Sequence, residues 1–160
     1  MKDQLLTSTF KIAGKTHSLS DWGEQPILVI NTATKCGLAP QFEGLEKIHQ
    51  QYKEKGLKVI GFPCNQFANQ EPETDDSMAT ACQINFGVSF DLTEKVDVNG
   101  ADAHPVYQAL SSLAPGALGT KSIKWNFTKF LIAPGGKVVK RYSPTTKPEN
   151  LIKDIEALIR

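Results

Sequence analysis

A reactive thiol is predicted at Cys36, which follows a short apolar strand and precedes a helix. Residues 27–31 are nearly all apolar and rich in β-branched side chains, as in a strand that is buried on both faces. After Pro40, apolar side chains recur at helical spacing until Gly56 ends the pattern. A thiol in such a turn lies at the positive end of the helix, whose unpaired N–H groups favour the thiolate. The alternative is that Cys36 is a small apolar side chain that only fills the turn.

The chain also contains neutral hydrogen-bond donors that such a thiol would need. A thiolate that attacks a peroxide requires donors that hold the sulfur as an anion, a proton for the leaving oxygen, and a partner that rescues the sulfenic acid. Amide and indole N–H groups serve the first two needs because they stabilise a developing anion without a competing charge. The candidates are the side chains of Gln66, Gln70, Trp125 and Asn126. Taken singly, each is more typical of an ordinary loop or core residue.

The composition predicts one ordinary globular domain. The 160 residues, of which 40% are hydrophobic, are enough for a single domain with its own core over residues 1–160. A formal net charge of +1 and a pI near 7.7 favour neither nucleic acid nor a membrane surface as a partner. No apolar run approaches the roughly 18 residues of a membrane-spanning helix, and the first ten residues lack the apolar run of a signal peptide. We therefore expect a cytoplasmic protein.

The cysteine and histidine positions argue against a metal site. Cys36, Cys64 and Cys82 are an odd number, which does not indicate a framework of structural disulfides in a cytoplasmic chain. No two of them are spaced as C-x-x-C, and the cysteines and histidines are scattered singly, unlike zinc ligands. We expect no metal and no other cofactor.

The order of the predicted elements indicates the fold class. A hairpin comes first, followed by a strand, a helix and a strand, then two more helices, a second hairpin and a last helix. This order matches an α/β, thioredoxin-like fold with a central mixed β-sheet flanked by helices and an N-terminal β-hairpin. The predicted strands are two around Gly14 within 9–18, then 27–31, 57–62, 127–132 and 137–142; the helices are 42–52, 75–86, 104–113 and one from about 148; residues 96–98 are a short extended piece.

Taken together, several stretches resemble the glutathione peroxidase family over nearly the whole chain. The most specific are Phe-Pro-Cys-Asn-Gln-Phe at residues 62–67 and Trp-Asn-Phe at residues 125–127. Asn-Thr-Ala-Thr-Lys-Cys-Gly at residues 31–37 and Gln-Glu-Pro at residues 70–72 add to the resemblance. It implies a thioredoxin-like fold, in agreement with the element order, and an enzyme that reduces hydrogen peroxide and organic hydroperoxides.

The resemblance also assigns roles to individual residues. The reactive cysteine or selenocysteine of the family falls on Cys36, and the glutamine of its Gln-Glu-Pro motif falls on Gln70. Its Trp-Asn pair falls on Trp125 and Asn126. The resemblance therefore selects Gln70 over Gln66 and implies that Gln66 supports the loop.

Cys82 decides how the sulfenic acid is resolved. Family members that use thioredoxin carry a second cysteine on this helix about 46 residues after the first, which is the separation of Cys36 and Cys82 here. The resemblance thus implies that Cys82 is the resolving thiol. The alternative is core packing, because Cys82 shares a helical face with Met78 and Phe86.

The reductant is expected to be thioredoxin. Binding of the glutathione carboxylates would favour arginine, and the chain has only Arg141 and Arg160, both near the C-terminus. Glutathione remains the alternative reductant, and a redox sensor or relay protein on the same fold remains the alternative function. Tetrameric family members carry a longer insertion before Trp-Asn-Phe than the loop at residues 114–122, so the resemblance favours a monomer.

Overall fold

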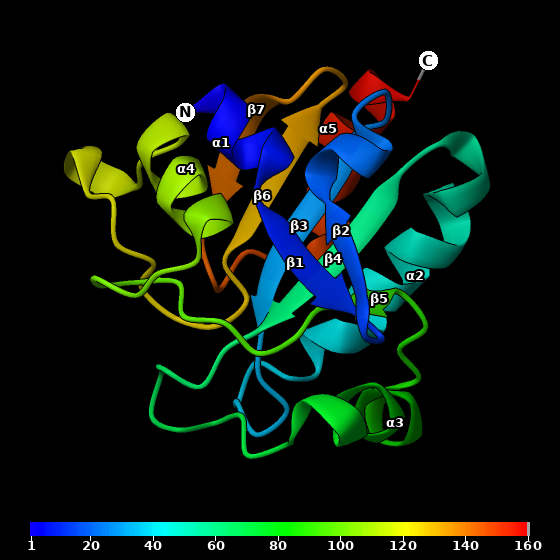
Figure 1. The fold of residues 1–160 in the computed structure, drawn as a ribbon. Coiled ribbons are helices and arrows are strands. Elements are labelled where there is room, and N and C mark those ends of the chain that lie inside the picture. The colour runs from blue at the N-terminus through cyan, green and yellow to red at the C-terminus, as the bar shows by residue number, and fades with distance from the viewer. Residues whose placement is uncertain (160) are drawn as a thin grey trace.

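The central sheet has five strands in the order β5-β4-β3-β6-β7 (Figure 1). A computed structural model describes residues 1–159, without the side chains of residues 117, 138 and 139. β3 pairs in parallel with β4, which pairs in parallel with β5, whereas β6 is antiparallel to both β3 and β7. The sheet is therefore mixed, as predicted. The strands are β3 (Ile27–Thr32), β4 (Lys58–Pro63), β5 (Asp91–Leu92), β6 (Lys129–Ala133) and β7 (Lys137–Tyr142).

β3 is the middle strand of the five, and every one of its residues is buried. Leu28 and Ile30 belong to the hydrophobic core on one face of the sheet, and Ile27 and Val29 belong to the core on the other face. A strand buried on both faces needs an apolar side chain at every position, which explains the uninterrupted apolar run in the sequence.

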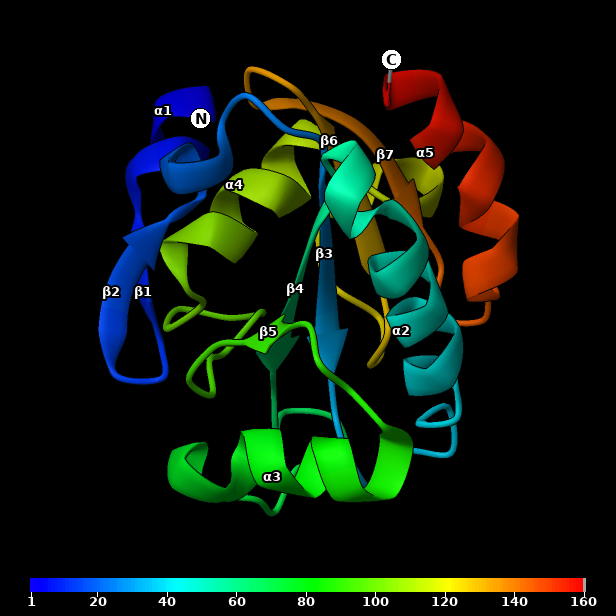
Figure 2. The ribbon, with the colours of Figure 1, turned by 90° about the vertical axis from the view of Figure 1, so that its right-hand side faces the viewer.

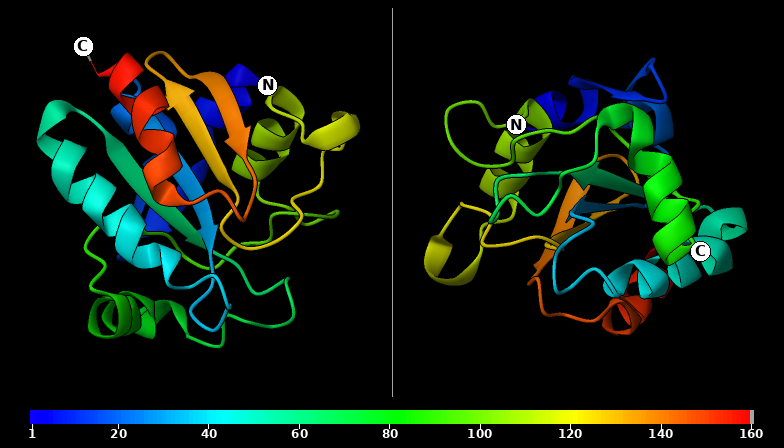
Figure 3. Two further views of the ribbon diagram at one scale, coloured as in Figure 1. Left: turned by 180° about the vertical axis from the view of Figure 1, so that it is seen from behind. Right: turned by 90° about the horizontal axis from the view of Figure 1, so that it is seen from below.

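Two layers of helices cover the two faces of the sheet (Figures 1, 2 and 3). The first core packs against α2 (Gln41–Tyr52) and α5 (Ile152–Leu158), which lie together on one face. The second core packs against α1 (Lys2–Thr7) and α4 (Pro105–Leu113) together with the N-terminal hairpin. The hairpin is formed by β1 (Thr9–Ile12) and β2 (Lys15–Ser18). Short 3-10 turns occur at Leu19–Trp22, Lys53–Lys55, Ala117–Gly119 and Pro148–Leu151.

α3 (Asp75–Phe86) lies below the carboxyl ends of β3 and β4 rather than on a face of the sheet (Figure 2). Thr74 begins the helix by accepting a hydrogen bond from the Ser77 N–H at 3.2 Å, and Gly87, at a φ of +70°, ends it. Among the twelve residues of α3, only Met78 and Cys82 are buried. Most of the helix surface therefore contacts solvent.

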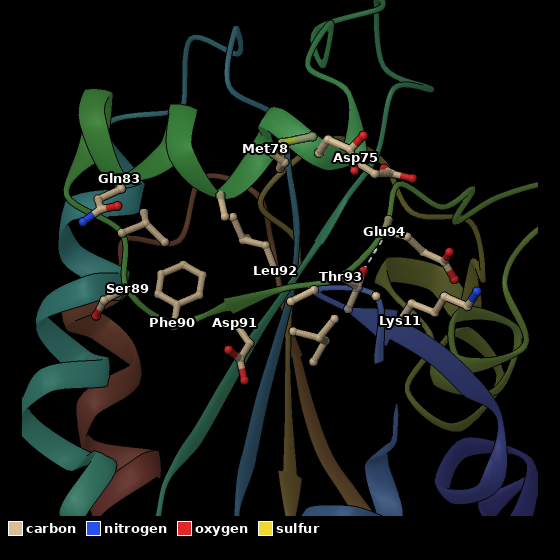
Figure 4. A pocket seen from close by; sticks show the side chains of 16 residues that line it. Lys11, Asp75, Met78, Gln83, Ser89, Phe90, Asp91, Leu92, Thr93 and Glu94 are labelled. Carbon is tan, nitrogen blue, oxygen red and sulfur yellow. Dashed lines mark hydrogen bonds between the residues drawn. The ribbon is translucent and has the colours of Figure 1, made fainter. Parts of the chain in front are cut away.

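A hollow of about 760 Å³ lies between α3, the tip of the N-terminal hairpin and residues 88–94 (Figure 4). Met78 projects into it from the helix, and Leu92 and Phe90 line it from the opposite side. Because packed contacts rather than intrinsic propensity hold most protein helices in place, α3, with two buried residues against four in α2, is expected to open more readily.

Two differences from the predicted elements concern short segments. Neither α1 nor the edge strand β5 was predicted, and residues 96–98, predicted as a short extended piece, lie outside the strands. β5 approaches β4 at Gly61, where an added Cβ would lie 2.6 Å from the Leu92 side chain. A larger residue at position 61 would require the Leu92 side chain to move, whereas Val96 meets the end of β4 through a hydrogen bond from its N–H to the Pro63 carbonyl at 2.9 Å.

Candidate active site

Cys36 lies in the turn between β3 and α2, where the sequence predicts it. The residue is buried, with 5% of its surface exposed. The Leu38 N–H donates to the Cys36 Sγ at 3.3 Å, and the Ala39 N–H donates to the Cys36 carbonyl at 2.9 Å. The turn thus directs a main-chain N–H at the sulfur, which stabilises a negative charge there.

Gln70 is brought to this turn by the loop that follows β4. The Lys35 N–H donates to the Gln70 carbonyl at 2.9 Å. The main chain of the loop therefore contacts the main chain of the turn at Lys35, the residue that precedes Cys36. The Gln70 side chain accepts a hydrogen bond through Oε1 from the Asn126 Nδ2 at 3.1 Å. Because this contact occupies the oxygen of Gln70, its Nε2 hydrogens remain the group that can donate to a ligand.

Asn126 is fully buried at the other side of that contact. Its Oδ1 has no hydrogen-bond partner within the described part of the chain. An unpaired acceptor in a buried place is costly, and such groups concentrate at functional sites. Trp125 is half-buried, contacts both cores and lies 5.5 Å from the Phe67 ring, measured between ring centroids.

Asn31 on β3 positions the Trp-Asn-Phe segment. Its Nδ2 donates to the Trp125 carbonyl at 3.2 Å, and its Oδ1 accepts from the Thr128 N–H at 3.1 Å. Its main-chain carbonyl accepts from the Phe127 N–H at 2.7 Å. Phe127 has a φ of +65°, which is rare for an aromatic residue and requires such firm support. Asn31 lies in one of the motifs quoted above, but its residue type and spacing alone do not indicate this role.

Gln66 is engaged elsewhere. Its Oε1 accepts from the main-chain N–H groups of Val98 at 2.7 Å and Asn99 at 3.1 Å, and its Nε2 donates to the Asn99 carbonyl at 2.9 Å. The side chain therefore holds the loop at residues 98–99 instead of pointing its donors at Cys36.

The three cysteines are all reduced and buried, but they are divided between the two cores. Cys36 and Cys82 belong to the core that α2 and α5 cover, whereas Cys64 belongs to the core on the other face of the sheet. Burial, with smaller effects of the nearby Glu71 and Glu73 carboxylates, raises the pKa of Cys82 to about 12. Cys82 is therefore a thiol rather than a thiolate at neutral pH.

Residues 1–159 contain no cluster of three or more histidine, cysteine, aspartate or glutamate side chains suited to a metal ion. Within the same part of the chain, no helix combines the length and apolar character that crossing a membrane requires.

Comparisons with known proteins show what the chain is similar to. A family model described as glutathione peroxidase matches residues 5–111, a range that includes Cys36, Gln70 and Cys82. The glutathione peroxidase of Lactococcus lactis subsp. cremoris (strain MG1363) is 49% identical over 152 residues, which cover 95% of this chain and 96% of that protein.

Solved structures agree as well. The crystal structure of Trgpx in apo form has a TM-score of 0.78 at 38% identity and matches 96% of this chain and 95% of its own. A thioredoxin-family thiol:disulfide interchange protein from Chlorobium tepidum TLS has a TM-score of 0.69 at 12% identity, over 97% of this chain and 96% of its own. The second likeness concerns the fold alone and confirms the prediction that it is thioredoxin-like.

Proposed function

The chain belongs to the glutathione peroxidase family and is a thiol peroxidase, and on this premise we propose that Cys36 is the residue that attacks the peroxide. The observation that carries the proposal is the contact between Gln70 and Asn126 beside the Cys36 turn. Together with the bond from the Lys35 N–H to the Gln70 carbonyl, it joins three segments that are far apart in the sequence next to the turn that carries Cys36. Gln70, Trp125 and Asn126 are proposed as the donors that serve the reaction.

The proposed reaction transfers one oxygen to sulfur. The Cys36 thiolate forms an S–O bond to one peroxide oxygen while the O–O bond breaks. The other oxygen leaves with the bonding electrons and takes a proton, giving water or an alcohol, and Cys36 becomes a sulfenic acid. Neutral donors suit this step because the negative charge moves from sulfur to the leaving oxygen, and both positions need stabilisation.

Replacing any one donor should slow this step. We expect Gln70→Ala, Trp125→Phe and Asn126→Ala each to lower the rate of Cys36 oxidation by about 10²–10³, the usual cost of removing one such donor. The three effects should not add, because the donors act as a unit. The measurement is the rate of thiol loss under excess hydrogen peroxide.

Gln66→Ala is the matched control for the donor variants. It removes a glutamine from the same loop, but one whose side chain binds residues 98–99. We expect its oxidation rate to stay near that of the wild type. Unchanged rates in all three donor variants would show that these residues do not serve Cys36.

We propose that Cys82 resolves the sulfenic acid. Its thiol attacks the Cys36 sulfur, an S–S bond forms, and the hydroxyl group leaves as water. Both cysteines lie in the same core, which favours Cys82 over Cys64 as the partner. A disulfide needs Cα atoms within about 7 Å, and we propose that α3 opens locally to bring the buried Cys82 to Cys36. α3 borders the hollow and buries only two of its own residues, so its local opening should cost little free energy.

Thioredoxin is the proposed reductant of this disulfide, and glutathione is the alternative. The guanidinium group of Arg141 donates to the carbonyls of Ala114, Lys121 and Ser122 at 2.8–3.1 Å. It is therefore committed to its own loop, while Arg160 lies outside the described residues. A steady-state peroxide assay with each reductant in turn tests the choice: faster turnover with glutathione than with thioredoxin would overturn it.

The remaining proposals concern the protein as a whole. A single domain over residues 1–160 is supported by the two cores that share one sheet. A monomer is supported by the short connection between α4 and β6. Light scattering in solution measures the mass and thereby tests the monomer. We also propose a cytoplasmic location without nucleic-acid or stable membrane partners, which the near-neutral net charge supports.

A further inference from the structure

Glu71 places a carboxylate in the wall of the site without a charged partner. Its side chain is fully buried, and none of the ion pairs among the described residues involves it. The nearby Lys95 ammonium donates to the main-chain carbonyl of Glu71, at 3.2 Å, rather than to its carboxylate. A buried carboxylate without a counter-ion costs free energy unless hydrogen-bond donors satisfy it, so the donors around Glu71 are needed to stabilise its carboxylate.

Those donors come from the turn that carries Cys36. The Thr34 N–H donates to the Glu71 Oε1 at 3.1 Å, and the Thr34 hydroxyl donates to the Glu71 Oε2 at 2.6 Å. The Glu73 N–H adds a longer contact to the Oε2 at 3.4 Å. One carboxylate therefore binds both the main-chain N–H and the hydroxyl of Thr34, a pair of hydrogen bonds called the grip below. Hydrogen bonds to an ionised acceptor are stronger than those to a neutral one.

The same two segments are joined next to this grip. The Lys35 N–H binds the Gln70 carbonyl. Within the loop that follows β4, the Glu71 N–H also donates to the Asn65 Oδ1 at 2.9 Å. Cys36 follows Lys35, and Gln70 precedes Glu71, so each proposed reactive side chain lies one residue beyond a fixed contact. The carboxylate thereby fixes the register between the segment of Cys36 and the segment of Gln70.

We propose that Glu71 is a positioning residue of the peroxide reaction, which holds the Thr34 turn so that the Cys36 sulfur faces the Gln70 and Asn126 amides. This inference rests on the proposed function of those residues. A displacement of about 1 Å between reacting groups can cost about 100-fold in rate, so the grip matters to the chemistry beyond its effect on folding.

Glu71→Gln tests the proposal because the variant keeps the shape of the side chain and removes its charge and one acceptor. We expect the second-order rate constant of Cys36 with hydrogen peroxide to fall about 10- to 100-fold. Alkylation of Cys36 by iodoacetamide needs the nucleophile but no donor for a leaving oxygen, so we expect it to change far less. The ratio of the two rate constants is a readout that a purely structural role would not move.

The chain offers a matched control and a second pair of variants. Glu46 on α2 accepts from the Ser89 N–H at 2.8 Å and the Ser89 hydroxyl at 2.6 Å, the same kind of grip away from Cys36. Glu46→Gln should leave the rate ratio unchanged. Thr34→Val should lower it because the hydroxyl donor is lost, and Thr34→Ser should restore it.

Each outcome decides something. If Glu71→Gln lowers both rate constants by the same factor, or neither, the positioning role is overturned. If that variant does not fold, the comparison of Thr34→Val with Thr34→Ser decides in its place, and equal ratios for the two overturn the proposal. If the wild-type Cys36 does not react with hydrogen peroxide at all, the proposed function itself is wrong and the inference fails with it.

Discussion

Cys36→Ser protein is expected to fold like the wild type and to reduce peroxide no faster than the uncatalysed background. The serine hydroxyl is not ionised near neutral pH, and its oxygen is a far weaker nucleophile than a thiolate. The exchange of one small, nearly buried side chain in a turn leaves the two cores in place. A thioredoxin-coupled assay with hydrogen peroxide measures the activity, and circular dichroism checks the fold.

Cys64→Ala serves as the control for this variant. Cys64 lies in the core on the other face of the sheet and accepts from the Gln66 N–H at 3.5 Å. The variant should keep its activity. Near-wild-type turnover by folded Cys36→Ser would mean that the reacting atom lies elsewhere in the molecule.

Cys82→Ser is expected to separate the two halves of the cycle. Oxidation of Cys36 by the first equivalent of peroxide should remain fast, because Cys82 does not contact the reacting oxygen in the proposed step. Thioredoxin-driven turnover should stop, because no disulfide forms for thioredoxin to reduce. The trapped sulfenic acid should take up a second oxygen under excess peroxide and become a sulfinic acid.

Mass spectrometry after one equivalent of peroxide measures this difference directly. The wild-type protein should lose two hydrogens as the Cys36–Cys82 bond forms, whereas Cys82→Ser should gain one oxygen. A Cys36–Cys64 bond in the wild type, or full thioredoxin-dependent turnover by Cys82→Ser, would leave Cys82 as a packing residue and reopen the question of the reductant.

The elements around Cys36 could be predicted because local patterns encode them. The apolar run at residues 27–31 predicted β3, which extends one residue further, and the acidic start with Gly87 at the end predicted α3 with its observed bounds. α1 escaped prediction because six residues are too short for a periodic pattern, and its place depends on Leu5 packing in the second core. β5 has two residues and depends on the absence of a side chain at Gly61.

The interior of the candidate site could be predicted only in part. Residue types and the family resemblance pointed to Gln70, Trp125 and Asn126, but not to the contacts that hold them. Asn31 reaches across 94 positions to the Trp125 carbonyl, and Glu71 reaches across 37 positions to Thr34. Such contacts depend on how the loops pack against one another at the end of the sheet, which periodicity and residue spacing in the sequence do not encode.

The division of the cysteines between the two cores gives the protein an internal reference for thiol counting. If Cys36 and Cys82 join, each oxidised molecule should carry a single label, at Cys64, after denaturation and alkylation, whereas each unreacted molecule should carry three, so the Cys64 label is the constant reference. Labelling of Cys64 in the native state would instead report that the layer of α1, α4 and the N-terminal hairpin has opened. Labelling before and after denaturation can thus distinguish oxidised enzyme from unfolded enzyme.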